Sequence, residues 1–549
     1  MKSNNCIKLW LAVATYLLLS LNIVNASTNS KRFIVGLNIL NYDGTKLGIK
    51  PGDTIYIEPG HRDHLRFYNI HGDSLNYVVF INNGGLVELS TTTCNFGIQV
   101  YNCSYFKLTG TGCSTLNYGI RIGSTPVGTN GLSLDGFSTN YEVDHIEVLK
   151  SGFAGICANP KPDCEGKLNR GNFTCRNTIF HDNYVHGTLG EAFYVGHSFY
   201  TGYTITCDSA KKVVYPHEIH GLKIYNNIVD STGLDGIQVG CATLDCEIYG
   251  NKVTNYGVKN EDDQNFGIII GGGTGGKCYN NSIINGSGDG INVFGIGNNI
   301  IYNNIIVNAG YSFSNSTSKK AHGIFCDDRS TIEGSSFNFF NNTIISPNGD
   351  GIRFFSTKSR NSKICNNIIL KPGSYGSYYY VNQSFVYYNS KTVDLTLSNN
   401  YFSNDVLPNM NFTNLDDINL YCSGLPIIDQ GMDVRVFDIF TDFNGNERVK
   451  NNACDIGAFE YVQPAMQKSN SIKIIPENSA GEITIYSTKK ENLDNISVYQ
   501  LSGQLIYNKK LSNQNSTTLN LRNMVKKGIY LVSAQTESDR NMNRIYVNN

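Results

Sequence analysis

The ionisable side chains of this sequence gather at one position of a repeated motif, directly before a glycine or, in one copy, before an alanine. That position holds Glu191, Asp235, Asp289, His322 and Asp350. Carboxyl and imidazole groups donate and accept protons when a covalent bond is cleaved. The pattern therefore indicates general acid and base chemistry, and we predict these five residues, with Arg353, as the catalytic set.

A second position, two residues after the same glycine, combines aromatic, amide and basic side chains. It holds Arg121, Tyr194, Gln238, Ile269, Asn292, Phe325 and Arg353. Aromatic faces stack on sugar rings, while amides and charges bond hydroxyls and carboxylates. We therefore predict a surface that binds a sugar polymer, with part of a histidine-rich segment beside it. The predicted substrate-binding residues are Arg121, Tyr194, His197, Gln238 and Asn292.

Hydrolysis of a glycosidic bond is the first reaction that these residues could support. It requires two carboxyl groups, about 5–5.5 Å apart in retaining enzymes and about 6.5–9.5 Å apart in inverting ones. Matching positions of stacked strands lie about 4.8 Å apart. The pairs that could meet these distances are Glu191 with Asp235 and Asp289 with Asp350.

Elimination by a uronate lyase is the second reaction. It requires a base and a cation that neutralises the substrate carboxylate. The candidates for these parts are Arg353, His322, His197 and Arg329. The alternative cation is a calcium ion, held by Asp327 and Asp328 or by residues 261–263. These residues leave the choice between lyase and hydrolase open.

The aspartates also have a structural interpretation, because Asp-Gly is a favoured turn pair. Asp235, Asp289 and Asp350 would then bond turn amides only. Glu191 and His322 depart from the Asp-Gly pattern and are the stronger catalytic candidates. If all of these residues are structural, the alternative function is that of a non-catalytic glycan-binding or adhesive cell-surface protein.

Two sequence elements alternate along the chain and must position these side chains. One is Gly-Ile-x-hydrophobic, and the other is an aromatic residue or Cys followed by Asn-Asn and β-branched residues, as in Tyr302-Asn303-Asn304-Ile305. The second Asn recurs with a base period near 23–25 residues, and weaker copies stand at Asn177, Asn251 and Asn400. Strands repeated at this period bury their inner faces only by stacking. The sequence thus predicts a parallel β-solenoid with a ladder of Asn amides.

On these motifs, the region from Asp53 to Tyr461 resembles the right-handed parallel β-helix proteins of the pectate-lyase-like superfamily. The resemblance implies a fold for residues 27–461, with an N-terminal cap, and leaves the chemistry open because the fold hosts lyases, hydrolases, epimerases and adhesins. Together with the ionisable residues, it leads us to expect an enzyme that cleaves an extracellular polysaccharide, as a lyase or a glycoside hydrolase, in a groove along the β-helix.

The last 78 residues have a different pattern. After a linker at 462–471, alternating strands in 472–549 predict a small β-sandwich. The motifs Val498-Tyr499, Gly503, Gly528-Ile529-Tyr530 and Arg544-Ile545-Tyr546-Val547 resemble the C-terminal sorting domain of the type IX secretion system of Bacteroidota, although that family usually has Lys where Arg544 stands. The resemblance implies that the type IX machinery exports the chain through the periplasm of a Gram-negative bacterium, and that the product is secreted or attached to the cell surface.

Composition and the N-terminus are consistent with export. Residues 1–26 have a basic start, an apolar stretch from Leu9 to Val24 and small residues at the end, which predicts a signal peptide. No later stretch is apolar for long enough to predict a membrane span in the mature chain. The chain has 44 Lys+Arg against 45 Asp+Glu, which argues against a nucleic-acid partner. Oxidising surroundings permit disulfides, for which Cys157 with Cys164 and Cys241 with Cys246 are the nearest pairs.

Overall fold

The structure is a computed structural model that describes residues 32–313, 320–373, 385–388, 393–405, 426–449, 453–461, 471–477, 482–500, 504–521, 524–526, 528–537 and 539–547. The predicted signal peptide, most of the predicted linker and Gly503 lie outside the described residues. The chain forms two compact units, Met1–Tyr461 and Val462–Asn549. Among the described residues, no helix is long and apolar enough to cross a membrane.

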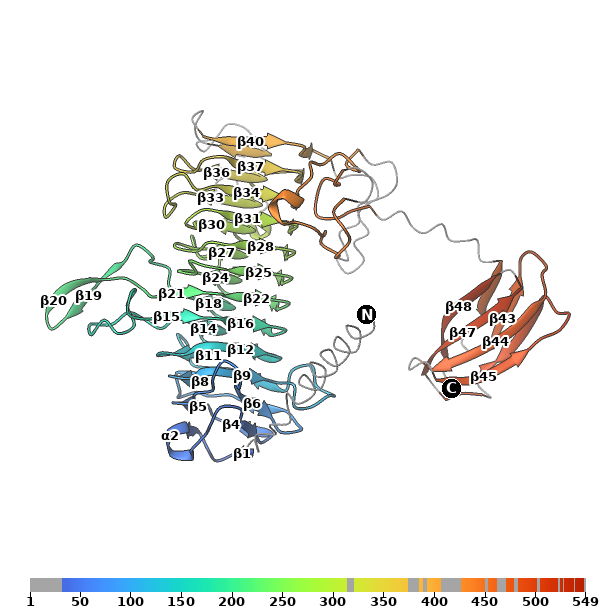
Figure 1. The fold of residues 1–549 in the computed structure, drawn as a ribbon, viewed down its shortest axis with the longest axis horizontal. Coiled ribbons are helices and arrows are strands. Elements are labelled where there is room, and N and C mark those ends of the chain that lie inside the picture. Colours follow the sequence, from blue (N-terminus) through green and yellow to red (C-terminus); the bar gives the residue numbers. More distant parts are fainter. Residues whose placement is uncertain are drawn as a thin grey trace, which may run out of the picture. The chain divides into compact units, whose positions relative to one another are not determined.

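The first unit is a parallel β-helix, seen as a stack of coils in Figure 1. Three long sheets, here called A, B and C, run along it.
Sheet A has 13 strands, in the order β1 (Arg32–Val35), β3 (Thr54–Ile57), β6 (Val78–Asn82), β9 (Ser104–Thr109), β12 (Thr139–Asp144), β16 (Thr178–His181), β22 (Lys223–Tyr225), β25 (Glu247–Tyr249), β28 (Lys277–Tyr279), β31 (Asn299–Tyr302), β34 (Phe337–Phe340), β37 (Ser362–Cys365) and β40 (Leu395–Ser398).

Sheet B has 12 strands, in the order β2 (Asn41–Asp43), β5 (Leu65–Tyr68), β8 (Phe96–Tyr101), β11 (Asn130–Asp135), β14 (Ile156–Ala158), β18 (Phe193–Val195), β24 (Ile237–Val239), β27 (Ile268–Ile270), β30 (Ile291–Val293), β33 (Ile324–Asp327), β36 (Ile352–Phe355) and β39 (Val386–Tyr388). Sheet C has 12 strands, in the order β4 (Gly60–Arg62), β7 (Val87–Leu89), β10 (Ile120–Ile122), β13 (Ile146–Leu149), β17 (Tyr184–His186), β23 (Ile228–Asp230), β26 (Lys252–Thr254), β29 (Ser282–Ile284), β32 (Ile305–Val307), β35 (Thr343–Ile345), β38 (Ile368–Leu370) and β41 (Tyr401–Ser403).

Short elements complete this unit. They are the helix α2 (Gly44–Leu47), the 3-10 helices Tyr311–Phe313 and Arg435–Phe437, a parallel pair β15 (Thr174–Arg176) and β21 (Glu218–His220), and an antiparallel pair β19 (Tyr203–Cys207) and β20 (Ala210–Val214). The segment expected to cap the first coil contributes β1 and β2, so it is part of the stack.

The interior of the β-helix is a continuous column of Ile, Val, Leu and Phe side chains from all three sheets. The recurring glycines lie where successive coils approach most closely. A Cβ atom on Gly236 would lie 2.5 Å from the carbonyl oxygen of Gly267, and one on Gly267 would lie 2.5 Å from that of Gly290. Such contacts exclude a side chain, which explains why glycine recurs at this position.

The predicted Asn ladder is confirmed in the turn between sheets A and C. Each Nδ2 donates to the Oδ1 of the next rung at 2.9–3.0 Å, and the rungs are Asn183, Asn227, Asn251, Asn281, Asn304, Asn342, Asn367 and Asn400. Asn177, which we predicted as a copy, is not a rung. It lies before β16 and donates to Asn140 Oδ1, and Asn183 takes the rung in that coil.

The segment 426–461 packs on the flank of the later coils. Asn303 and Asn341, at the turns from sheet A to sheet C, donate to the carbonyl oxygens of Thr441 and Asp455. Arg448 is fully buried and its Nη1 lies 2.8 Å from Glu460 Oε1. A buried charge needs such a partner, so this segment is held by specific polar contacts as well as by apolar packing.

The second unit consists of two antiparallel sheets. One has the order β42 (Ile472–Glu477), β43 (Glu482–Ser487) and β46 (Ser516–Asn520), and the other has the order β45 (Leu505–Lys510), β44 (Leu493–Gln500), β47 (Gly528–Thr536) and β48 (Arg540–Val547). Apolar side chains from both sheets form one core. The predicted all-β fold, a parallel β-helix followed by a small sandwich, is thus confirmed.

Candidate functional site

The outer face of sheet B carries the predicted binding column. Parallel pairing aligns Tyr194, Gln238, Ile269, Asn292, Phe325 and Arg353 from β18 to β36. Arg121 is the exception, because Gly119-Ile120-Arg121-Ile122 belongs to β10 of sheet C. There it pairs with Glu88 and Glu147 at 3.2 and 2.6 Å. The prediction that Arg121 belongs to the same column is therefore wrong.

Four cavities follow one another along this face, and we call them together the sheet B groove. Their volumes are about 430, 890, 680 and 350 Å³, from the coil of β8 to that of β33. The predicted binding residues Tyr194, His197, Gln238 and Asn292 all line them. Aromatic walls come from Phe153, Phe199, Phe266, Phe294 and Phe325. A groove with aromatic and amide walls is suited to an extended sugar chain.

The predicted catalytic residues that precede the recurring glycine are linked from coil to coil by hydrogen bonds. Asp235 Oδ1 accepts from Phe266 N at 2.8 Å, and Asp289 Oδ1 accepts from His322 N at 2.5 Å. His322 Nδ1 in turn accepts from Asp350 N at 3.0 Å. Burial raises the pKa of Asp289 to about 7 and that of Asp235 well above its usual range, and it holds the pKa of His322 far below. Asp235, Asp289 and His322 thus each accept a hydrogen bond from a backbone amide of the next coil.

Glu191 differs from the rest of this column. Its side chain is 3% exposed, it lines the 680 Å³ cavity, and its Oε2 has no hydrogen-bond partner among the described residues. Burial raises the pKa of this carboxyl to about 7. A buried acid with one oxygen unbonded, held near neutral pKa at a cavity wall, is a typical proton donor or acceptor.

Asp350 and Arg353 bind each other. Arg353 Nη1 lies 3.0 Å from Asp350 Oδ2, and its guanidinium group lies over the rings of Phe355 and Tyr387. Neither residue lines the four cavities. This pair thus lies outside the four cavities, next to His322 of the 350 Å³ cavity.

The predicted calcium ligands Asp327 and Asp328 have other partners. Asp327 binds the Arg329 guanidinium group at 2.7 Å, and Asp328 Oδ2 accepts from the backbone amides of Thr357 and Lys358. Of the alternative segment 261–263, Asp262 and Asp263 line the 350 Å³ cavity. Within the described ranges, no group of three metal-binding side chains converges in the groove.

One wall of the groove is built by two insertions, residues 159–173 and 196–217, and the second projects from the stack in Figure 1 as β19 and β20. A disulfide joins Cys164 of the first insertion to Cys207 of the second. The predicted bridges Cys157–Cys164 and Cys241–Cys246 are wrong, because Cys157, Cys241 and Cys246 are free and buried. His197 stacks on Tyr203 of the second insertion at 4.8 Å, and burial lowers its pKa to about 4. His197 is therefore a neutral ring that shapes the wall.

Removing this disulfide should loosen the wall and leave the coils intact. We expect Cys207→Ser with Cys164→Ser to favour separation of the two insertions by about 2–4 kcal/mol, the usual contribution of a disulfide. Limited proteolysis should then cut within 159–173 or 196–217 while the thermal midpoint of the β-helix stays nearly unchanged. A parallel fall in the midpoint would contradict a local role. Wild-type protein treated with iodoacetamide but no reductant is the control.

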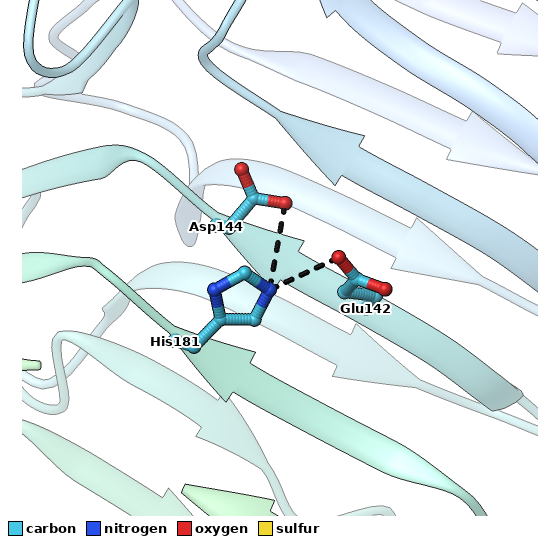
Figure 2. Close-up of side chains that lie close together, drawn as sticks. All are labelled: Glu142, Asp144 and His181. Atoms are coloured by element: carbon cyan, nitrogen blue, oxygen red, sulfur yellow. Dashed lines mark hydrogen bonds and ion pairs between the residues drawn. The ribbon is translucent and has the colours of Figure 1, made fainter. Parts of the chain in front are cut away.

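Sequence analysis missed a cluster on the outer face of sheet A, formed by Glu142, Asp144 and His181 (Figure 2). His181 Nε2 lies 3.0 Å from Glu142 Oε1 and 3.9 Å from Asp144 Oδ2. The Lys107 ammonium group binds the same two carboxylates at 2.5 and 2.9 Å. Since Lys107 supplies the cation there, the cluster is an ion-pair network. Only the register of β12 against β16, which the sequence did not reveal, brings these residues together.

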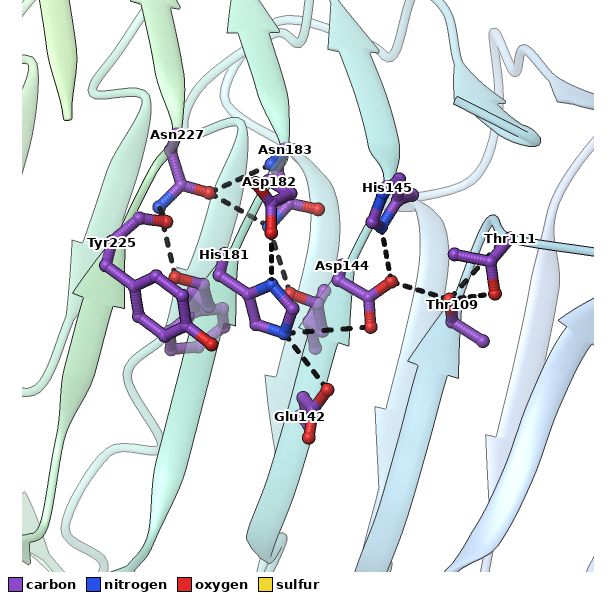
Figure 3. A network of polar contacts seen from close by, with 12 residues as sticks. Thr109, Thr111, Glu142, Asp144, His145, His181, Asp182, Asn183, Tyr225 and Asn227 are labelled. Atoms are coloured by element: carbon purple, nitrogen blue, oxygen red, sulfur yellow. Dashed lines mark hydrogen bonds and ion pairs between the residues drawn. The ribbon is translucent and has the colours of Figure 1, made fainter. Parts of the chain in front are cut away.

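This network extends to His145, Asp182 and the Asn183–Asn227 rungs (Figure 3). Although burial opposes it, hydrogen bonds to Glu142 and Asp182 and the charge of Asp144 raise the pKa of His181. The hydrogen bond from His181 lowers the pKa of Glu142 to about 2. The network is therefore most complete when His181 is protonated and Glu142 is ionised.

His181→Gln should accordingly destabilise the protein more in mild acid than in base. Protonated His181 stabilises the fold below its unfolded pKa, and this contribution is lost as the pH rises through its higher folded pKa. We expect a loss of about 2 kcal/mol at pH 5, where a charge-assisted hydrogen bond disappears, and a smaller loss at pH 9. Urea unfolding at both values measures it. His220→Gln, which changes a partly exposed histidine of β21, is the control, and an equal loss at both pH values would contradict the argument.

Comparison with known proteins identifies both units. Residues 473–548 match the family model of the secretion system C-terminal sorting domain, and residues 203–369 match that of the right handed beta helix region. This sorting domain marks proteins that are secreted through the type IX system, so the chain is an exported protein. No curated protein matches the sequence.

Several solved structures are similar to the β-helix. A pectate lyase, Pel9A, has 12% identity and a TM-score of 0.38, with 78% of this chain and 96% of that one covered. An alginate lyase from Paenibacillus sp. str. FPU-7 has 14% identity and a TM-score of 0.33, with coverage of 65% and 99%. The catalytic domain of a GH87 alpha-1,3-glucanase has 13% identity and a TM-score of 0.25, with coverage of 69% and 70%. The similar structures thus include polysaccharide lyases and glycoside hydrolases.

Proposed function

We propose that the exported chain cleaves an extracellular polysaccharide in the sheet B groove, as a lyase or a glycoside hydrolase. The observation that carries the proposal is Glu191, a buried carboxyl group with a free Oε2 at the wall of a 680 Å³ cavity. Leaving a buried polar atom without a hydrogen bond costs about 1–3 kcal/mol. Such a cost is typical of a group that is kept for binding or chemistry.

The surroundings of Glu191 support a role in proton transfer. With a pKa of about 7, the carboxyl group exchanges its proton near neutral pH, where a general acid or base is most effective. Asp235 stands at the same position of the next coil, about 4.8 Å away along the stack. The charge of Glu191 contributes to the raised pKa of Asp235, after burial. Retaining glycosidases hold two carboxyl groups about 5–5.5 Å apart, and two carboxyl groups on adjacent coils are compatible with that distance.

The binding surface supports a polymeric substrate. Tyr194 Oη and Gln238 Nε2 both bond Ser198 Oγ at 2.8 Å, which fixes their positions on the groove floor. Fixed polar groups between aromatic walls bind sugars at a low cost in side-chain entropy. The four consecutive cavities give room for several sugar units.

The test is an assay of the mature chain with neutral and uronic-acid polysaccharides. Two signals are recorded: reducing ends, and absorbance near 235 nm, about the wavelength expected for an unsaturated elimination product. Cleavage of any polymer supports the proposal. Binding without cleavage would instead favour a non-catalytic glycan-binding protein, the function that the backbone bonds of Asp235, Asp289 and His322 would suit.

A further inference from the structure

We infer that the sheet B groove is built for a neutral, hydroxyl-rich glycan and that the reaction in it is hydrolysis. This inference rests on the proposed function, since it specifies the substrate of the same groove. It is carried by the unpaired hydrogen-bond acceptors of the groove, by the charges that surround Glu191, and by the chemistry that those charges permit.

Three of the four cavities are lined by a residue with a buried amide oxygen that has no partner in the described chain. These atoms are Asn130 Oδ1, Asn159 Oδ1 and Asn292 Oδ1. Asn130 Nδ2 donates to Ser133 Oγ at 3.1 Å, and its Oδ1 has no such bond. Asn292 is 1% exposed, and its side chain bonds the Asp289 carboxyl group.

An unpaired acceptor requires a donor from the ligand. Sugar hydroxyl groups donate, whereas an ionised carboxylate only accepts. A ligand with a hydroxyl group near each acceptor would remove three desolvation costs of about 1–3 kcal/mol each. A uronate carboxylate placed at the same points would leave the acceptors unpaired and would add repulsion between oxygen atoms.

The charges around Glu191 also favour a neutral ligand. Among the described residues that line its cavity, the charged ones are Glu191, Asp235, Asp263 and Arg329. Arg329 is bound to Asp327 and lies over the Phe294 ring at 4.0 Å. Farther out, Lys259 and Glu261 act on Glu191 in opposite directions.

The neighbouring cavities contain cations as well as acids. Lys320 lines the 350 Å³ cavity together with Asp262, Asp263 and Asp289, and Lys161 lines the 890 Å³ cavity together with Asp135. Arg66 and Asp135 line the 430 Å³ cavity. Every cavity therefore has acids beside its cations. No part of the groove has the excess of positive charge that a polyuronate, with one carboxylate on each sugar, would require.

Hydrolysis suits this environment because it needs no carboxylate on the substrate. Protonated Glu191 gives its proton to the glycosidic oxygen as the bond from that oxygen to the anomeric carbon breaks. Water then adds its hydroxyl group to the anomeric carbon, and its remaining proton returns to the carboxyl pair of Glu191 and Asp235. One water is consumed and two new hydroxyl groups form. Elimination, by contrast, depends on a neighbouring carboxylate whose charge a cation neutralises.

The experiment measures both cleavage and binding. Wild-type mature chain is incubated with xylan, mannan, β-glucan and α-1,3-glucan, and with polygalacturonate and alginate. Binding of the same polymers to Glu191→Gln is measured by affinity electrophoresis. We expect reducing ends from a neutral glycan without absorbance near 235 nm, and binding at least tenfold tighter than to either polyuronate. Asn292→Ala should weaken the binding about five- to tenfold, which corresponds to about 1–1.4 kcal/mol.

Asn338→Ala is the matched control for Asn292→Ala. Asn338 is also buried with an unpaired Oδ1, but it stands on β34 of sheet A. It should leave binding unchanged, so a similar effect of both substitutions would overturn the role of Asn292. Cleavage of a polyuronate with absorbance near 235 nm would overturn the inference while supporting the proposed function. Binding of a neutral glycan without cleavage would support the ligand class and refute the proposed function. Neither binding nor cleavage of any polymer would overturn both.

Discussion

Glu191→Gln is expected to lower kcat on the cleaved polymer by about 10²–10⁴-fold, the usual contribution of a general acid or base. Glutamine keeps the size of the side chain and one carbonyl oxygen, so binding should stay within about twofold. In the wild type, kcat should fall as the pH rises above about 7, because the proton that Glu191 donates is lost there. Steady-state kinetics between pH 5 and 9 measure both effects.

A second effect of the same substitution separates chemistry from folding. The folded pKa of Glu191 lies above its unfolded value, so its ionised form opposes folding. This cost is absent below about pH 4.5 and complete above about pH 7, where it reaches about 3 kcal/mol. Glu191→Gln should therefore raise the thermal midpoint at pH 8 and leave it nearly unchanged at pH 4. A variant that gains stability and loses activity shows that the carboxyl group serves function.

Glu247→Gln is the control for Glu191→Gln. Glu247 is a partly exposed acid on sheet A that pairs with Lys223 at 3.0 Å. It should change neither kcat nor the pH profile. If Glu191→Gln folds and retains wild-type kcat, Glu191 is not the proton-transferring group.

Asn281→Ala is expected to destabilise the β-helix by about 4 kcal/mol, the largest effect that we expect on folding. Asn281 is fully buried, and its Oδ1 accepts from both the backbone N and Nδ2 of Asn251. Its Nδ2 donates to Ile248 O and to Asn304 Oδ1. Alanine leaves at least two backbone groups buried without partners, each costing about 1–3 kcal/mol.

Equilibrium unfolding in urea, followed by circular dichroism, measures this loss. Ser282→Ala, which changes the next residue on the outward face of β29, should cost less than about 0.5 kcal/mol. A loss below about 1 kcal/mol for Asn281→Ala would mean that water replaces the amide, and the ladder would then contribute little to stability.

Much of the fold could be predicted because each coil repeats the same turn and the same close strand packing. The buried Asn amide and the closely packed glycine have few substitutes, so the Asn-Asn and Gly-Ile motifs identify their turns and strands in sequence. Arg121 shows where this reasoning fails. Gly119-Ile120 has the same local pattern as Gly236-Ile237, but it belongs to sheet C, and only its place in the coil distinguishes the two.

The candidate site was predicted only in part for the same reason. The spacing of coils brought Glu191 and Asp235 together, but it could not show which side chains bond backbone. Asp235 accepts from the amide of the next coil, whereas Glu191 Oε2 does not bond any described residue. The Cys164–Cys207 bridge and the Glu142–His181 contact depend on where the chain re-enters the stack after an insertion. The repeat motifs do not specify this position.

The coil register also determines how such a protein can change over evolutionary time. Each coil contributes one side chain to the floor of the groove, and each contacts mainly its two neighbours. A substitution in one coil therefore alters one position along the glycan. Duplication or deletion of a whole coil changes the length of the floor by about 4.8 Å. Substitutions can thus change the specificity for the glycan, and recombination between homologous repeats can change the preferred chain length independently.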